Sequence, residues 1–300
     1  LWADGVEVGR GDLSTGEGLA EALAGVETAY YLVHSMGGGP GFADRDREAA
    51  RRFGAAARSA GIGHLIYLGG LLPADEASEH LRSRAEVGRL LAEAVPTTEF
   101  RAGPVVGSGS TSFEMVRYLT ERIPLMLAPS WIDHEVQPIA IRDVLFYLTL
   151  ALDAPPLGLL DIGADRLTFR RMLETYAELR GLRRIIWTLP ALLPQLAARC
   201  IGALTPIPNA LAVPIVQGMI QSLVADTRRA RESFPDVAPI DYRMAVRLAL
   251  GRVERGEVET FAAEDVADAR EAAVVPLVIT DGEDGPGRRT RRAPRAAVPD

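Results

Sequence analysis

Three candidate strands recur along the first hundred residues at intervals of about thirty-five residues, at 29–33, 64–68 and 98–102. Helical patterns separate them, over 42–60 and 80–94. Continuous apolar runs such as 29–33 are typical of strands covered on both faces. Strand–helix–strand units of this length form parallel sheets with right-handed crossovers. The rhythm therefore predicts an α/β fold, with a doubly wound parallel sheet.

The rest of the chain predicts further elements and a coarse division. The expected elements are a strand at 6–8, a strand at 159–162 and helices at 19–23, 112–123, 141–153, 168–180, 241–253 and 258–272. We expect a partial nucleotide-binding domain over 1–108 and a mostly helical, substrate-side region over 109–272 that is interleaved with it. Residues 273–300 are expected to form a disordered tail. This segment is rich in glycine, proline and arginine, and its apolar residues show no regular spacing.

Composition excludes several classes of function. The net charge of −7 argues against a nucleic-acid partner. A single cysteine, Cys200, excludes a disulfide framework and fits a cytoplasmic location. The four histidines have no metal-ligand spacing, so no metal site is predicted.

The stretch 185–224 is unusually apolar, with Arg199 as its single charge. Prolines interrupt it five times, so no run reaches the ~18–20 apolar residues that a spanning helix needs. We favour an apolar substrate lobe or a protein-contact face for this stretch. A membrane-surface contact, which would make the protein membrane-peripheral, is kept as an alternative.

Five short motifs, in this order and spacing, carry a resemblance to a known family. They are Gly11-Asp12-Leu13, Gly25-Val26, Tyr67-Leu68-Gly69-Gly70, the segment 101–107 (RAGPVVG) and the segment 137–144 (QPIAIRDV). Together they resemble the extended and atypical short-chain dehydrogenase/reductases. Similarity is strongest to epimerase/dehydratase-like proteins related to NmrA and to the 39-kDa accessory subunit of respiratory complex I. The resemblance implies a Rossmann-like fold that binds NAD or NADP together with a small-molecule substrate.

The resemblance also implies which residues contact the dinucleotide. These positions are Asp12, His34, Ser35, Met36, Gly69, Arg84, Gly103, Pro104 and Val105. Asp12 would meet the adenine edge, although a turn or helix-cap aspartate would look the same. The loop from His34 would pass close to the phosphates and ribose, or would be a plain flexible loop. Residues 103–107 would line the nicotinamide pocket, or simply end a strand.

The chain departs from the family at its catalytic positions. All thirty-three basic residues are arginine, so the lysine of the family's Tyr-x-x-x-Lys pair is missing. His80 and Arg84 stand where that pair is expected, and i, i+4 spacing keeps them on one helix face. His80 would act as the acid/base and Arg84 would bind the nicotinamide ribose. The alternative is a solvated helix face.

A second departure concerns the phosphate loop. The glycine-rich turn that opens such domains is not found in this sequence, so we expect a sheet that lacks the first βα unit and a form that binds dinucleotide weakly. Two functions remain open. One is an NAD(P)-dependent oxidoreductase or epimerase/dehydratase-like enzyme with a small, apolar substrate. The other is a non-catalytic NAD(P)-binding redox sensor or scaffold.

Overall fold

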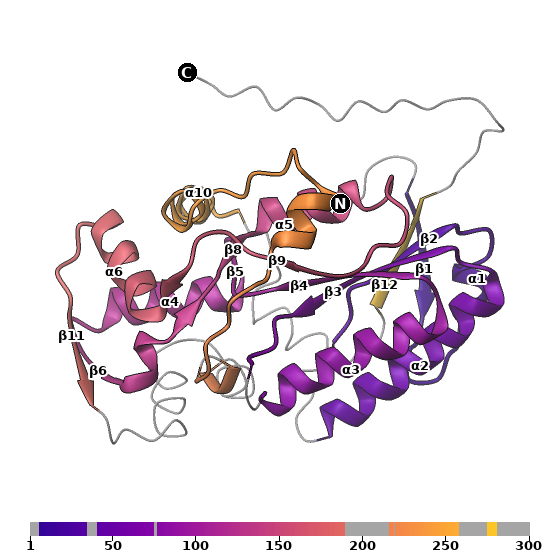
Figure 1. The fold of residues 1–300 in the computed structure, drawn as a ribbon, viewed down its shortest axis with the longest axis horizontal. Helices are drawn as coiled ribbons and strands as arrows, with labels where there is room; N and C mark the ends of the chain where they lie inside the picture. Colours follow the sequence, from indigo (N-terminus) through magenta and orange to yellow (C-terminus); the bar gives the residue numbers. More distant parts are fainter. Residues whose placement is uncertain are drawn as a thin grey trace.

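The computed structural model describes residues 6–34, 41–74, 77–189, 216–218, 220–257 and 275–280 of the chain. Figure 1 shows an elongated molecule, with the central sheet and its long helices toward one end and a smaller group of helices and strands at the other.

A parallel sheet of four strands forms the centre of the fold. Its order is β2 (Thr28–Tyr31), β3 (His64–Gly70), β4 (Thr97–Ala102) and β9 (Gly158–Ile162), and all neighbours run parallel. The expected parallel and adjacent strands at 29–33, 64–68 and 98–102 are confirmed. Because the strands are parallel, their carboxyl ends meet at one edge, where α/β proteins bind ligands.

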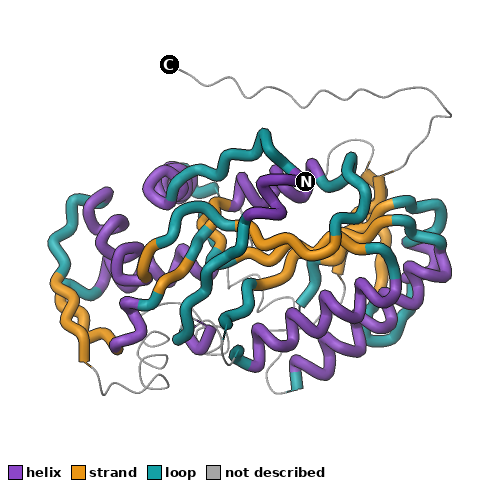
Figure 2. The backbone as a smooth tube through the Cα atoms, viewed as in Figure 1, coloured by secondary structure: helices purple, strands orange, loops and turns teal. Residues whose placement is uncertain are grey.

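Helices cover both faces of this sheet, giving three layers (Figure 2). The helices α2 (Phe42–Ala60) and α3 (Glu79–Ala94) pack on one face, where residues such as Phe53 and Leu91 are buried. The helix α5 (Ile141–Leu150) and the short α9 (Arg228–Ser233) lie on the other face. Burial on both faces explains why β3 reads as a nearly continuous apolar run.

The first strand does not join the central sheet. β1 (Val6–Gly11) pairs antiparallel with β12 (Val275–Thr280), and α1 (Leu19–Ala22) leads from it to β2. Among the described residues β2 pairs only with β3, so it is an edge strand. In the described part of the chain, the central sheet thus has an open edge at β2, as a sheet that lacks its first βα unit would have.

The expectation that 273–300 is a disordered tail is wrong for residues 275–280, which form β12. This segment reads Val-Pro-Leu-Val-Ile-Thr, and β-branched residues favour strands. Its partner lies more than 260 residues away in the sequence, so local periodicity carried no sign of the pairing.

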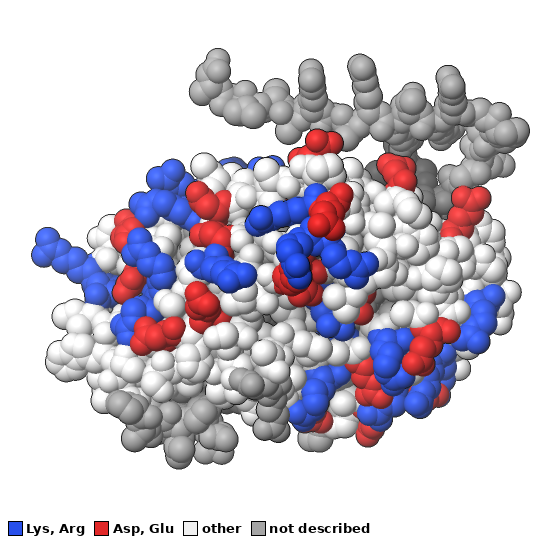
Figure 3. Space-filling view, in the orientation of Figure 1, with Lys and Arg blue, Asp and Glu red and all other residues white. Residues whose placement is uncertain are grey.

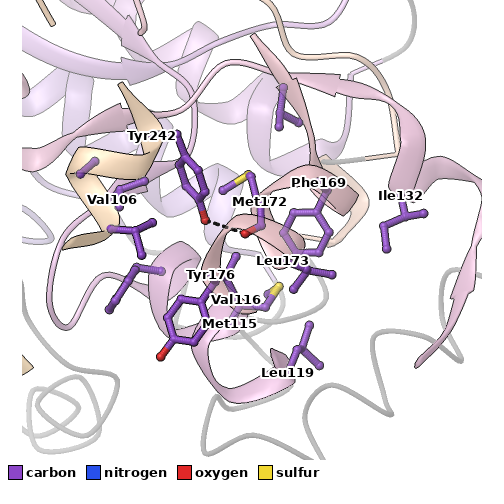
Figure 4. Packing of buried hydrophobic residues seen from close by; sticks show 14 of the residues in the cluster. Val106, Met115, Val116, Leu119, Ile132, Phe169, Met172, Leu173, Tyr176 and Tyr242 are labelled. Carbon is purple, nitrogen blue, oxygen red and sulfur yellow. Dashed lines mark hydrogen bonds between the residues drawn. The ribbon is translucent and has the colours of Figure 1, made fainter. Parts of the chain in front are cut away.

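A second lobe is built on α4 (Thr111–Arg122), α6 (Phe169–Leu179) and α10 (Tyr242–Glu254). Their buried faces form one apolar cluster, drawn in Figure 4, whose labelled members come from all three helices, from the strand β5 (Val105–Val106) and from the 3-10 helix η2 (Ser130–Asp133). The Tyr242 hydroxyl donates to the Met172 carbonyl oxygen at 3.3 Å, which satisfies a polar group inside this core. The helices expected at 112–123, 168–180 and 241–253 are confirmed.

Short strands connect the two lobes and lie along the border of the second lobe. β6 (Leu125–Pro129) pairs parallel with β11 (Ile185–Leu189). The remaining short elements are β5 (Val105–Val106), β7 (Glu135–Val136), β8 (Ile139–Ala140), β10 (Leu167–Thr168) and the 3-10 helix η2 (Ser130–Asp133). β5 pairs with β8, and β7 pairs with β10.

Of the remaining expected elements, some are confirmed and others lie outside the described residues. The strand at 159–162 and the helix at 141–153 are confirmed as β9 and α5, with bounds shifted by a few residues. The helix expected at 258–272 and most of the apolar stretch 185–224 lie outside the described residues. None of the helices that the structure describes is long and apolar enough to cross a membrane.

Candidate functional site

His34, His80 and Arg84 come together at the carboxyl edge of the central sheet. His34 follows β2, whereas His80 and Arg84 lie on successive turns at the start of α3. This helix begins at a serine cap, since the Ser78 hydroxyl accepts a hydrogen bond from the Leu81 amide at 3.4 Å. Burial lowers the pKa of both histidines, and the Arg84 charge acts in the same direction on each.

The environment keeps His80 neutral. Burial lowers the pKa of His80 to about 3, and the charges of Arg84 and His34 act in the same direction. His34 is exposed, and desolvation of its ring together with the Arg84 charge lowers its pKa. A base with so low a pKa accepts a proton poorly at neutral pH. The His80 ring is therefore neutral at neutral pH, and its role as the acid/base stays a prediction.

Arg84 lies across the end of β3. Its guanidinium donates to the Leu68 carbonyl oxygen, and its own carbonyl accepts from the Tyr67 hydroxyl at 3.0 Å. A Cβ added at Gly70 would stand 3.5 Å from the Arg84 side chain. This separation is an ordinary van der Waals contact.

A buried ion pair adjoins Arg84 and was not anticipated. The Arg101 guanidinium donates to the Glu99 carboxylate at 2.7 Å, and the Glu99 side chain is 8% exposed. Burial raises the pKa of Glu99, whereas Arg101 and Arg84 act against this rise. A Cβ at Gly69 would lie 3.0 Å from the same carboxylate, and one at Gly88 only 2.3 Å away. Gly69, expected to contact the cofactor, therefore accommodates Glu99.

A second buried carboxylate lies on the neighbouring helix. Asp46 of α2 is 6% exposed, and its carboxylate accepts from the Ser83 hydroxyl of α3 at 3.3 Å. Its charge acts on His34, opposing the fall in the pKa of that histidine. Sequence reasoning missed both carboxylates. The signal available for Glu99 was a pair of opposite charges, two residues apart, in a strand that is otherwise buried.

Asp12 is engaged in its own turn. Its carboxylate accepts from the amide and the hydroxyl of Ser14, both at 2.6 Å. The Ser14 hydroxyl and amide lower the pKa of Asp12. The geometry is that of a turn aspartate, the alternative that the sequence left open, and a contact with adenine stays a prediction.

The segment from Gly103 packs against the second half of the chain. A Cβ at Gly103 would stand 2.2 Å from the Gln137 carbonyl oxygen. The Pro104 carbonyl accepts from the Ile139 amide at 3.1 Å, and Val105 pairs with Ile139 in the β5–β8 ladder. These three positions lie at the sheet edge, as expected, but their recorded contacts are with Gln137, Ile139 and Leu71 rather than with His80. Ser35 and Met36 lie outside the described residues.

A cavity of about 590 Å³ opens beside Gln137. The buried Gln137 side chain donates to the Ala164 carbonyl at 2.7 Å and accepts from the Ala225 amide at 3.0 Å, so it joins two loops. The cavity is lined by Gln137, Ala164, Arg166, Val224, Ala225, Asp226, Thr227, Arg228 and Arg231. Its lining contains three arginines and one aspartate, so the net charge of the lining side chains is positive. No group of acidic, histidine or cysteine side chains suited to a metal occurs among the described residues.

The neutral state of His80 makes stability depend on pH. The folded pKa of about 3 lies below the ~6.5 of an unfolded histidine, so the contribution is fully present above pH 6.5 and is lost as the pH falls toward 3. Between pH 7 and pH 5 we expect the wild type to lose about 1–2 kcal/mol more unfolding free energy than His80→Asn. Urea denaturation at both pH values measures this difference, and equal losses would contradict the environment described for His80.

Comparison with known proteins identifies the fold. No protein-family model and no curated protein sequence matches the chain. Among solved structures, MoeE5 in complex with UDP-glucuronic acid and NAD superposes with a TM-score of 0.62 at 17% identity, over 82% of this chain and 85% of that one. UDP-glucose 4-epimerase from Thermotoga maritima gives 0.61 at 12% identity, over 82% and 83%. Triphenylmethane reductase from Citrobacter sp. gives 0.60 at 16% identity, over 80% and 82%.

These similarities define a class. The chain has a Rossmann-like α/β fold, of the type found in epimerases, dehydratases and reductases. This fold is the one that the family resemblance of the motifs implies.

Proposed function

We propose that this protein binds NAD or NADP at the carboxyl edge of its parallel sheet and acts as an NAD(P)-dependent oxidoreductase or epimerase/dehydratase-like enzyme on a small molecule. The observation that carries the proposal is the convergence of His34, His80 and Arg84 at that edge. The fold supports it, because several proteins of similar structure were solved with NAD.

Arg84 suits an anionic dinucleotide. A guanidinium carries five N–H groups, and the recorded bond to Leu68 uses one nitrogen, so further donors remain for a ribose hydroxyl or a phosphate. Burial lowers the pKa of the two neighbouring imidazoles, and the fixed charge of Arg84 adds to this effect. Neutral rings offer one donor and one acceptor each, which fits hydroxyl and carboxamide groups.

His80 is proposed to orient the substrate. When bound, the nicotinamide supplies the hydride acceptor or donor. A neutral His80 would donate a hydrogen bond to the reacting oxygen of the substrate, as a preorganised group that needs no change of charge. The Glu99–Arg101 ion pair lies on the neighbouring strand β4, where the Arg84 charge acts on the Glu99 carboxylate.

The cavity beside Gln137 would bind the end of the substrate that lies away from the reacting atoms. Arg166, Arg228 and Arg231 would favour an anionic group there. We propose that the substrate combines such a group with the apolar portion expected from the sequence.

The low pKa of His80 also favours a second function, in which the protein binds NAD(P) without catalysis. The chain has no lysine, and His80, with a pKa of about 3, is poorly suited to exchanging protons at neutral pH. A non-catalytic NAD(P)-binding redox sensor or scaffold would need no proton-exchanging group.

Thermal unfolding in the presence of nucleotides tests dinucleotide binding, even when it is weak. A ligand at ten times its Kd raises stability by about 1.4 kcal/mol. We expect NAD(H) or NADP(H), at millimolar concentration, to raise the Tm by more than AMP and nicotinamide mononucleotide do at the same concentration. Equal effects of dinucleotide and mononucleotides would count against a site that spans both halves of the cofactor.

A further inference from the structure

The small sheet of β6 and β11 carries an apolar face that is not packed against the described part of the protein. Its side chains alternate, so that Met126 and Ala128 point into the core of the second lobe. The opposite face presents five large apolar side chains, each between 41% and 60% exposed: Leu125, Leu127, Ile185, Trp187 and Leu189. Parallel register places Leu125 beside Ile185 and Leu127 beside Trp187, so the five form one continuous patch.

This apolar face is held rigidly. Arg170 of α6 donates to the Ile186 carbonyl at 3.1 Å and to the Thr188 hydroxyl, and its guanidinium pairs with Asp133. The exposed side chains therefore project from a fixed platform. Figure 1 places β6 and β11 at the far end of the second lobe, away from the central sheet.

The two segments that carry the patch are poor in acidic residues, and Asp133, which follows the first of them, is paired with Arg170. No acidic residue occurs between Arg122 and Asp133, or between Glu178 and Asp226, whereas the second interval contains four arginines. Arg183 lies just before β11, is exposed and forms no ion pair with the described residues. In Figure 3 the surface at the β6–β11 end is largely uncharged, with basic and acidic side chains interleaved above it. This distribution contrasts with a chain whose net charge is −7.

We propose that the β6–β11 face docks onto an anionic membrane surface. Trp187 and its apolar neighbours would enter the interface between headgroups and acyl chains, where indole rings are favoured. Arg183 would contact the lipid phosphates. A stable dimer buries about 800 Å² and some 20–30 residues on each partner, which five side chains do not approach. A membrane needs no matching counterpart, because each inserted side chain contributes separately.

Vesicle flotation tests this docking. The full chain is expected to float with vesicles of phosphatidylcholine containing about one third phosphatidylserine, and more weakly with phosphatidylcholine alone. Trp187→Gln and Leu127→Gln should each weaken the binding at least about tenfold, the effect of losing one inserted apolar side chain. Arg183→Gln should weaken binding to the anionic vesicles about fivefold and have little effect on neutral ones.

A matched control comes from another face. Leu145 is 54% exposed on α5, so Leu145→Gln removes a similar apolar surface and should leave binding unchanged. Circular dichroism checks that each variant is folded. If the wild type does not float, or if Leu145→Gln weakens binding as much as Leu127→Gln does, membrane docking is wrong. A concentration-dependent dimer that Trp187→Gln dissociates, with no flotation, would instead assign the face to a second copy.

Discussion

Replacing Gly103 with alanine is expected to lower the free energy of unfolding by about 3 kcal/mol or more, the upper range for overpacking a site that cannot yield. The added Cβ would stand 2.2 Å from the Gln137 carbonyl oxygen and 3.3 Å from a Leu71 methyl group. The carbonyl is backbone, so it cannot turn aside as a flexible side chain could. Any shift of Gln137 would also disturb the two loops that its side chain joins.

Gly63→Ala is the matched control for this substitution. Its added Cβ would meet its nearest atom, the Glu27 carbonyl oxygen, at 3.8 Å, which is an ordinary contact. This variant should be nearly neutral in urea denaturation. The pair separates two roles of Gly103, because a cofactor-lining glycine without a packing role would lose dinucleotide affinity while keeping wild-type stability.

Arg84→Ala is expected to weaken dinucleotide binding by about 1.5–3 kcal/mol, the range for a hydrogen bond from a charged donor. The same substitution removes the bond to the Leu68 carbonyl, so unfolding must be measured alongside affinity. Arg84→Lys keeps the charge but loses the planar fork, and it should recover only part of the affinity.

Arg82→Ala is the control on the same helix. Arg82 is exposed, and its guanidinium donates to the Ala77 carbonyl rather than to the sheet edge. Its loss should leave affinity unchanged. Equal weakening by Arg82→Ala and Arg84→Ala would mean that a diffuse positive field attracts the ligand and that Arg84 has no specific contact with it.

The central fold could be predicted because local and tertiary signals agree there. β3 is buried on both faces, so its apolar run follows directly from its place in the sheet. Gly61 ends α2 in a left-handed conformation, as its position in the sequence indicated. The β6–β11 and β1–β12 pairs could not be predicted in this way, because each joins segments that lie far apart along the chain.

The candidate site was only partly predictable. The spacing of His80 and Arg84 placed both on one face of a helix, and the structure brings His34 to them. The sequence could not show the desolvation that keeps His80 neutral, since this depends on packing from other elements. Nor could it show that Gly69 and Gly88 make room for the Glu99 carboxylate, which is a contact between two strands and a helix.

The most direct test of the proposed cofactor site is an NMR titration of the protein with NADH and NADPH. The ring resonances of its four histidines are monitored during the titration. His34 and His80 lie at the proposed site, whereas His64 is buried at the start of β3 against Thr98 and His134 lies beside Ile220. We predict saturable shifts of the His34 and His80 rings only, with a Kd that rises in Arg84→Ala. Saturable shifts confined to His64 or His134, or no shift at millimolar dinucleotide, would contradict a dinucleotide site at this edge of the sheet.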